Sequence, residues 1–135
     1  MAYYSQLHTL NVQYAKNLDN LTNKKLELTK QTAMSTVYNQ YVLASRQELQ
    51  NVEDSIMKLA GVESMEDAVQ YAKQHVNDSK LESLINDRAN IQETIRTYEV
   101  LYVSITESIT MLLDYIDELN ASQTEIIADL TELNK

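Results

Sequence analysis

Apolar residues recur at alternating spacings of three and four over the C-terminal part of the chain, from Leu81 to Leu133. The first seam position of this heptad pattern holds Leu81, Arg88, Ile95, Tyr102, Ile109, Ile116, Gln123 and Leu130, and the second holds Leu84, Ile91, Tyr98, Ile105, Leu112, Leu119, Ile126 and Leu133. Only Arg88 and Gln123 interrupt the pattern, and neither shifts its register. A sustained heptad of this kind predicts one long coiled-coil helix over residues 80–133.

A second long helix is predicted over residues 3–60, where the heptad pattern is weaker. Its seam is polar at five positions, namely Asn17, Lys24, Gln31, Ser35 and Ser45. Gly61, the single glycine of the chain, follows this helix and is suited to its C-cap, because glycine adopts the left-handed conformation without steric strain. Helix stability in water comes mainly from burial of an apolar face, so a seam this polar indicates that further helices pack around it.

Between the two long helices, the sequence predicts a short connector helix over residues 64–76. Ser64 has an acidic residue three positions on, which is a capping-box pattern. Residues 77–79 have the composition of a turn, and Ser79 with Glu82 repeats the capping pattern at the start of the C-terminal helix.

The similar lengths of the long helices predict an antiparallel hairpin with the connector helix at its tip. This arrangement brings residue 20 near residue 120 and residue 40 near residue 100. Residues 99–132 carry eight acids and no Lys or Arg, whereas residues 16–30 carry four lysines and two acids. Exposed ion pairs contribute only ~0.2–1 kcal/mol each, so these charges favour an orientation more than they stabilise it.

The predicted fold class is therefore all-α, with one elongated helical domain over residues 1–135. We expect a long antiparallel coiled-coil hairpin of two helices of about 55 residues each that oligomerises into a bundle. The chain has no Pro, Cys, Trp or Phe, which agrees with this class and excludes disulfides and thiolate metal sites.

Composition also narrows the function classes. The net charge of −9 argues against binding to the phosphate backbone of nucleic acids, which needs clustered Lys and Arg, and we expect no sequence-specific nucleic-acid partner. No run of about 18 apolar residues is present, so no membrane span is expected. The first ten residues lack the basic and apolar segments of a signal peptide, which predicts a protein made in the cytoplasm.

The residues that could carry chemistry are not arranged for it. His8 and His75 fall at opposite ends of the predicted hairpin and cannot share a metal. Asp114, Asp117 and Glu118 share a helix face, but that face points away from the seam, where carboxylates favour solubility. A chain with one glycine cannot form a phosphate loop or a nucleophile elbow. We therefore predict a non-enzyme with no catalytic residue, cofactor, metal or small-molecule substrate.

In the middle of both long helices, apolar residues also occur outside the seam. A lone hairpin cannot bury them, and a connector helix that reaches about 20 Å from the tip is too short to cover them. We therefore predict a protein interface, the mid-length belt, which binds further copies of the chain or other proteins of an assembly. The mid-length belt consists of Val37, Tyr41, Leu43, Val100, Leu101, Val103, Met111 and Leu113.

Arg88 and Gln123, the polar residues of the C-terminal seam, have two interpretations. Buried polar groups at seam positions set register or oligomeric state. Alternatively, both residues lie near an end of the helix, where a long polar side chain reaches water. Arg88 is also placed to pair with Glu53 or Glu48 across the hairpin.

Two functional settings fit these features. As a small, Tyr-, Asn- and Gln-rich helical protein without cysteine, the chain resembles bacteriophage virion and head-assembly components, such as scaffolding and inner core proteins. The resemblance implies a non-enzymatic scaffold or core component that is incorporated in a virion. The alternative is a helical chaperone or substrate of a bacterial secretion system. The W-x-G turn of small type VII substrates is missing, and the β-hairpins of prefoldin would have to come from residues 60–80, which read as helix.

Overall fold

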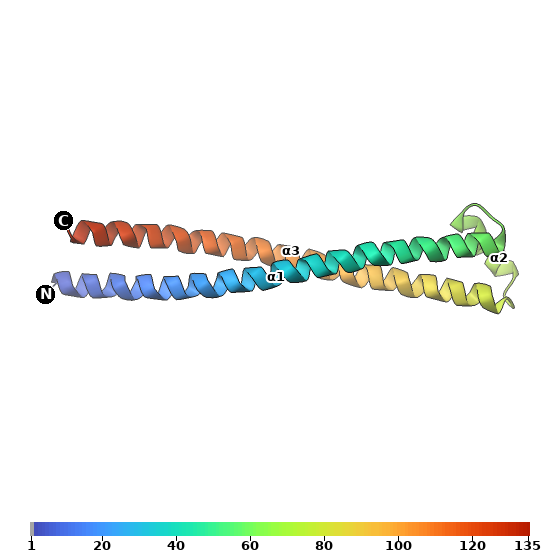
Figure 1. The fold of residues 1–135 in the computed structure, drawn as a ribbon, viewed down its shortest axis with the longest axis horizontal. Coiled ribbons are helices and arrows are strands. Elements are labelled where there is room, and N and C mark those ends of the chain that lie inside the picture. Colours follow the sequence, from blue (N-terminus) through green and yellow to red (C-terminus); the bar gives the residue numbers. More distant parts are fainter. Residues whose placement is uncertain (1) are drawn as a thin grey trace. The chain divides into compact units, whose positions relative to one another are not determined.

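In a computed structural model, which describes residues 2–135, the chain forms three α-helices (Figure 1). They are α1 (Ala2–Ala60), α2 (Met65–Gln74) and α3 (Ser79–Leu133). The long helices α1 and α3 contain 59 and 55 residues and pack antiparallel. The predicted all-α fold, with two long antiparallel helices and a short connector helix, is confirmed. Oligomerisation into a bundle stays a prediction.

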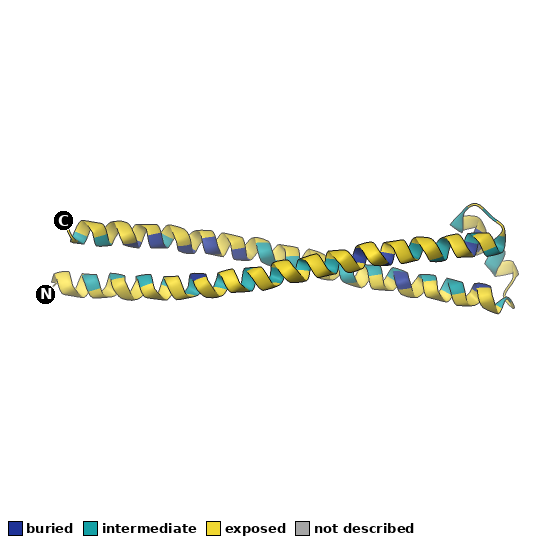
Figure 2. Cartoon of the chain, viewed as in Figure 1, coloured by how far each residue is buried: buried dark blue, intermediate teal, exposed yellow. Residues whose placement is uncertain are grey.

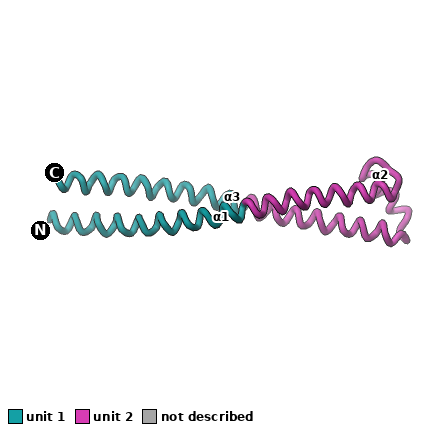
Figure 3. Tube along the Cα trace, viewed as in Figure 1, with its two compact units in different colours: residues 1–35, 104–135 teal, residues 36–103 magenta. Residues whose placement is uncertain are grey.

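The chain divides into two compact units, which are coloured separately in Figure 3. Unit 1 combines the part of α1 up to Ser35 with the chain from Ser104 onward. Unit 2 is Thr36–Val103 and includes α2. The single domain over residues 1–135 stays a prediction, and each unit is described by itself below.

The heptad positions form the contact between α1 and α3 in both units. In unit 1, Leu21, Ile116 and Leu119 make a buried cluster with Leu28 packed against it. All seam positions of α3 except Tyr102 are buried or half-buried. Figure 2 shows buried residues in dark blue and half-buried residues in teal along the helices. Each fully buried Leu or Ile contributes about 1.5–3 kcal/mol.

Contacts between the helices have the predicted antiparallel register. In unit 1, Asn17 Nδ2 donates a hydrogen bond to Ser122 Oγ at 3.0 Å. Within residues 2–135, the ion pairs that join α1 to α3 are Arg46–Glu99 and Arg88–Glu53, both in unit 2. The lysines of residues 16–30 form no ion pair with α3 in the described part of the chain. The charge distribution nevertheless predicted the observed antiparallel orientation.

The best-packed part of unit 2 is where all three helices meet. Ile56 of α1, Ala68 of α2 and Leu81 of α3 form one cluster, with exposed fractions of 0%, 0% and 1%. Because α2 has only 10 residues, it is too short to be stable alone, and this contact holds it in place.

The end of α1 is a Schellman motif centred on Gly61. Gly61 has φ +69°, the left-handed region expected for this residue. The Val62 amide donates to the Met57 carbonyl at 3.0 Å, and the Gly61 amide donates to the Lys58 carbonyl at 3.3 Å. These bonds satisfy carbonyls that the helix end leaves free. The predicted C-cap is confirmed.

Of the two predicted N-caps, one is confirmed and one is wrong. The Asp67 amide donates to Ser64 Oγ at 3.1 Å at the start of α2. At the start of α3, the Leu81 amide donates to Asp78 Oδ1 at 3.1 Å. Asp78, not Ser79, is therefore the cap. Ser79 is already the first residue of α3, so it cannot cap that helix.

The two polar seam residues of α3 are both held by α1. Gln123 is 8% exposed, and its Nε2 donates to the Tyr14 carbonyl at 3.0 Å, so it does not reach water. Its Oε1 is buried without a hydrogen-bond partner. Arg88 Nε lies 3.8 Å from Glu53 Oε1, and both side chains are half-buried. The predicted pairing of Arg88 with Glu53 is confirmed.

We expect Gln123→Leu to raise the free energy of unfolding by about 1 kcal/mol, because it removes a buried carbonyl that has no partner. The Tyr14 carbonyl stays within the hydrogen-bond ladder of α1, so the change leaves no new orphan group. Urea unfolding followed by circular dichroism measures the effect, with Gln13→Leu on the exposed side of α1 as control. A less stable Gln123→Leu variant would show that the bond to Tyr14 outweighs the unpaired carbonyl.

Candidate interaction surface

The part of unit 2 farthest from α2 along the helices is built around three tyrosines. The rings of Tyr41 and Tyr98 stack, with centroids 4.9 Å apart and an interplanar angle of 16°. Tyr38 lies 6.1 Å from Tyr98 at a tilt of 40°. Tyr41 stays 50% exposed, so this contact is only partly dry. The tyrosine stack therefore presents aromatic surface to the outside of unit 2.

The mid-length belt residues of unit 2 are exposed and come from the same stretches of α1 and α3 as the tyrosine stack. Their exposed fractions are 44% for Val37, 50% for Tyr41, 56% for Leu43, 64% for Val100, 38% for Leu101 and 55% for Val103. Monomeric proteins rarely expose large apolar side chains at this density. These six residues lie on more than one side of the helix pair, because Val37, Tyr41 and Leu101 precede seam residues whereas Leu43 and Val103 follow them. Together we call them the apolar surface of unit 2.

The remaining two mid-length belt residues belong to unit 1. Met111 is 72% exposed and Leu113 is 46% exposed. Tyr115, two residues further along α3, is also exposed, with Lys24 Nζ lying 5.4 Å from its ring centroid. Unit 1 thus has its own exposed apolar residues on α3.

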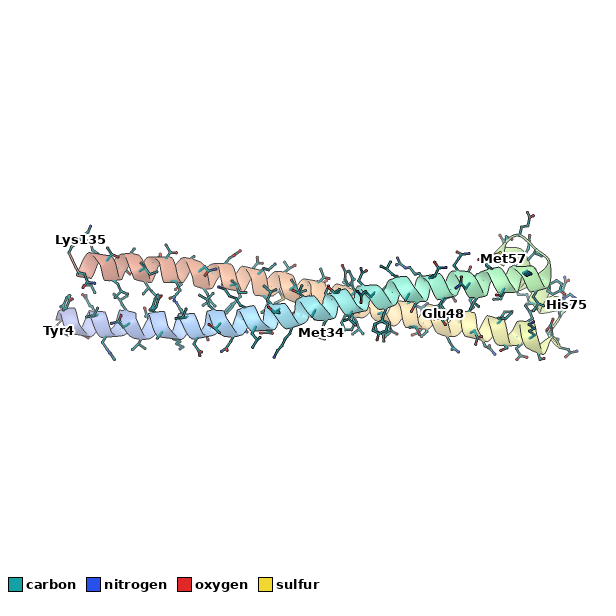
Figure 4. The ribbon with its side chains drawn as sticks, in the orientation of Figure 1. Tyr4, Met34, Glu48, Met57, His75 and Lys135 are labelled. Carbon is teal, nitrogen blue, oxygen red and sulfur yellow. The ribbon has the colours of Figure 1, made fainter. Side chains whose placement is uncertain are left out.

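Helix α2 does not cover the apolar surface of unit 2. It packs near Val52 and Leu59 of α1 and near Leu84 and Ile85 of α3. Figure 4 shows Met57 and His75 at the end of unit 2 that holds α2. The prediction that the connector helix is too short to cover the apolar residues of unit 2 agrees with these contacts.

The acidic and histidine side chains that could bind a metal or act in catalysis lie on open helix surfaces. Asp114, Asp117 and Glu118 are all exposed. Within residues 2–135, no three His, Asp or Glu side chains gather closely enough to hold a metal ion. His75 stacks on Tyr71, with ring centroids 3.8 Å apart. In that same range, no helix has the length and apolar content needed to cross a membrane.

Unit 1 has a groove of about 560 Å³ between the N-terminal part of α1 and the C-terminal part of α3. Its lining includes the apolar residues Leu10 and Leu133 and the acidic residues Asp129 and Glu132. The groove brings exposed carboxylates beside hydroxyl and amide groups. It contains no histidine, lysine or arginine that could act with those carboxylates.

Sequence reasoning missed a second surface, which consists of residues from both helices on one side of the helix pair. The residue immediately after each seam residue lies on one side of the antiparallel pair in both helices, and the residue immediately before lies on the other. We call the first side of unit 1, over residues 8–32 and 106–131, the Thr flank. Seven of its sixteen residues are threonine. The signal was present in the sequence, but it appears only when both helices are read together.

Comparisons with protein families, with curated proteins and with solved structures find no match to this chain.

Proposed function

We propose that this chain is a non-enzymatic assembly protein, a helical scaffold or core component that acts by packing against other protein surfaces. The observation that carries the proposal is the apolar surface of unit 2, where two helices expose six large apolar residues around the tyrosine stack. Interface cores are depleted in charge and enriched in aromatic residues, and this surface has both properties. Its partners are further copies of the chain or other proteins of the assembly.

The proposed setting is a bacteriophage virion or head assembly, into which the protein is incorporated after synthesis in the cytoplasm. Small size, helical character and richness in Tyr, Asn and Gln support this setting by resemblance. The alternative setting, a chaperone or substrate of a bacterial secretion system, is supported by the chain's size, acidity and helical character. The small type VII substrates join their helices by a W-x-G turn, whereas here α2 and two capped turns separate the long helices. That difference counts against the small type VII substrates.

We expect Leu101→Glu combined with Val103→Glu to lower the mass of the associated protein while helix content stays unchanged. Both side chains are exposed within the chain, so the charges disrupt an interface without disrupting the fold. Light scattering after size exclusion measures the mass, and circular dichroism measures helix content.

The matched control is Asn90→Glu with Thr94→Glu, which adds the same charge at exposed positions of α3 outside the mid-length belt. Association that is unchanged in the Leu101/Val103 variant would contradict the proposal. Loss of all helix would also contradict it, because the two residues would then be internal core.

A further inference from the structure

The two flanks of unit 1 differ sharply in charge. Over residues 8–32 and 106–131, the Thr flank carries only Lys25 and Asp117 as charged residues. The opposite flank, over the same residues, carries Lys16, Glu27, Lys30, Glu118, Glu125 and Asp129. All sixteen residues of the Thr flank are exposed. The chain has a net charge of −9, yet this exposed flank carries only two charges. Another protein surface can therefore pack on it without burying many charged groups.

Contacts between the helices identify the opposite flank as one shared side. Lys24 Nζ lies 5.4 Å from the Tyr115 ring, and a groove between the helices is lined by Glu27 and Ser108. A second groove is lined by Lys16 and Glu125. Tyr115, Glu27, Ser108, Lys16 and Glu125 each precede a seam residue. The grooves lined by these residues therefore lie on the charged side of unit 1.

Five of the seven threonine hydroxyls of the Thr flank donate hydrogen bonds within their own helices. Each of five donates to the carbonyl four residues earlier in its own helix, at 2.8–3.1 Å: Thr22, Thr29, Thr110, Thr124 and Thr131. A hydroxyl bound in this way does not need water as its acceptor. Covering the flank therefore leaves these five hydroxyls satisfied, and the threonine methyl groups can join Leu18, Leu113 and Ile127 in an apolar contact.

The two charges of the Thr flank are complementary and unpaired. Lys25 follows Lys24 and Asp117 follows Ile116, so both lie near the level at which Lys24 contacts Tyr115. Among residues 2–135, neither Lys25 nor Asp117 takes part in an ion pair. The positive and the negative group lie at the same level on neighbouring helices. A two-fold rotation therefore brings the positive group of one copy opposite the negative group of a second copy.

We infer that a second copy of the chain packs on the Thr flank and forms a two-fold four-helix bundle over unit 1. The symmetry axis runs along the helices, so that α1 of each copy lies antiparallel to α3 of the other at the same level. Lys25 of each copy then pairs with Asp117 of the other. Antiparallel neighbours on both sides of every helix are the arrangement of four-helix bundles.

The area of the Thr flank suits this occupant. Its 26 residues of α3 extend about 40 Å at ~1.5 Å per residue, and two helices side by side are about 20 Å wide. The flank therefore offers about 800 Å², which is close to the ~800 Å² that each partner buries in a standard protein interface. This surface differs from the apolar surface of unit 2, so the inference goes beyond the proposed function.

Charge-reversal variants test the arrangement. We expect Lys25→Asp and Asp117→Lys each to weaken the two-chain species about tenfold or more, because each places two like-charged pairs in the interface. An equimolar mixture of the two variants restores both opposite-charge pairs, so it should form a two-chain species with one copy of each. Native mass spectrometry identifies that mixed species, and sedimentation velocity measures its stability. Repulsion within one chain would not be relieved by mixing.

Lys16→Asp and Glu125→Lys are the matched controls, because they reverse charges on the opposite flank and should leave association unchanged. A wild-type protein that is a single chain at every concentration would overturn the inference. Single variants that associate like wild type, or a mixture that stays as single chains, would overturn it too. The experiment is repeated with Leu101→Glu alone, because Leu101 precedes the seam residue Tyr102, whereas Val103 follows it as the Thr flank residues follow theirs. The two-chain species should persist in this background, so failure of the apolar surface of unit 2 and failure of the Thr flank are distinguishable.

Discussion

Replacing Ile56 with Ala is expected to lower the free energy of unfolding by about 2–5 kcal/mol, the range for large-to-small substitutions in a packed core. Ile56 is fully buried at 0% exposure, and its side chain lies where α1, α2 and α3 meet. Three helices enclose the site, so the surrounding atoms have little freedom to collapse into the cavity. Urea unfolding followed by circular dichroism gives the difference.

The control for Ile56→Ala is Leu26→Ala, on the same helix but 55% exposed. It removes a side chain of similar size, and its expected effect is within about 0.5 kcal/mol, as for surface substitutions elsewhere. Equal losses at the two positions would contradict the view that the contact among the three helices is the best-packed part of unit 2.

Ala68→Glu is expected to release α2 from the other helices and to destabilise unit 2 by about 3 kcal/mol or more, because it places a charge in an apolar cluster without a partner. Ala68 is 0% exposed and lies in the buried cluster with Ile56 and Leu81. Once undocked, a helix of 10 residues melts. Limited digestion with trypsin should then cut after Lys73, within α2.

Val69→Glu is the matched control for Ala68→Glu, because it adds the same charge to the neighbouring residue, which is 37% exposed. Cleavage after Lys73 should stay slow in this variant. Rapid cleavage in both variants, or in neither, would show that docking through Ala68 does not determine the stability of α2.

The long helices and the end of α1 could be predicted because they depend on neighbours within about four residues in sequence. The heptad places each buried residue of α3, and Gly61 ends α1 by its own backbone preference. The start of α3 was harder, because Asp78 and Ser79 are both good caps and adjacent. The choice between them depends on where the first turn begins, which the packing of Leu81 against Ile56 determines.

The exposed apolar residues could also be identified from the sequence, since a residue outside the seam of a two-helix pair has nothing to cover it. Contacts across the helices could not. The stacking of Tyr41 on Tyr98 depends on side-chain rotamers, and the sequence shows only that both residues lie at a similar level. Lys25 and Asp117 are a second example. The sequence shows that they lie near one level on one flank, but not whether they pair within the chain.

The tyrosine stack provides an intrinsic spectroscopic probe of unit 2. The chain has no tryptophan, so its near-ultraviolet absorption comes from nine tyrosines. Tyr41 and Tyr98 are nearly parallel with centroids 4.9 Å apart, so we expect their transitions to couple and to contribute to the near-ultraviolet circular dichroism. Tyr41 is half exposed, so a protein that covers the apolar surface of unit 2 changes this signal. Binding at that surface can therefore be followed in the unlabelled protein.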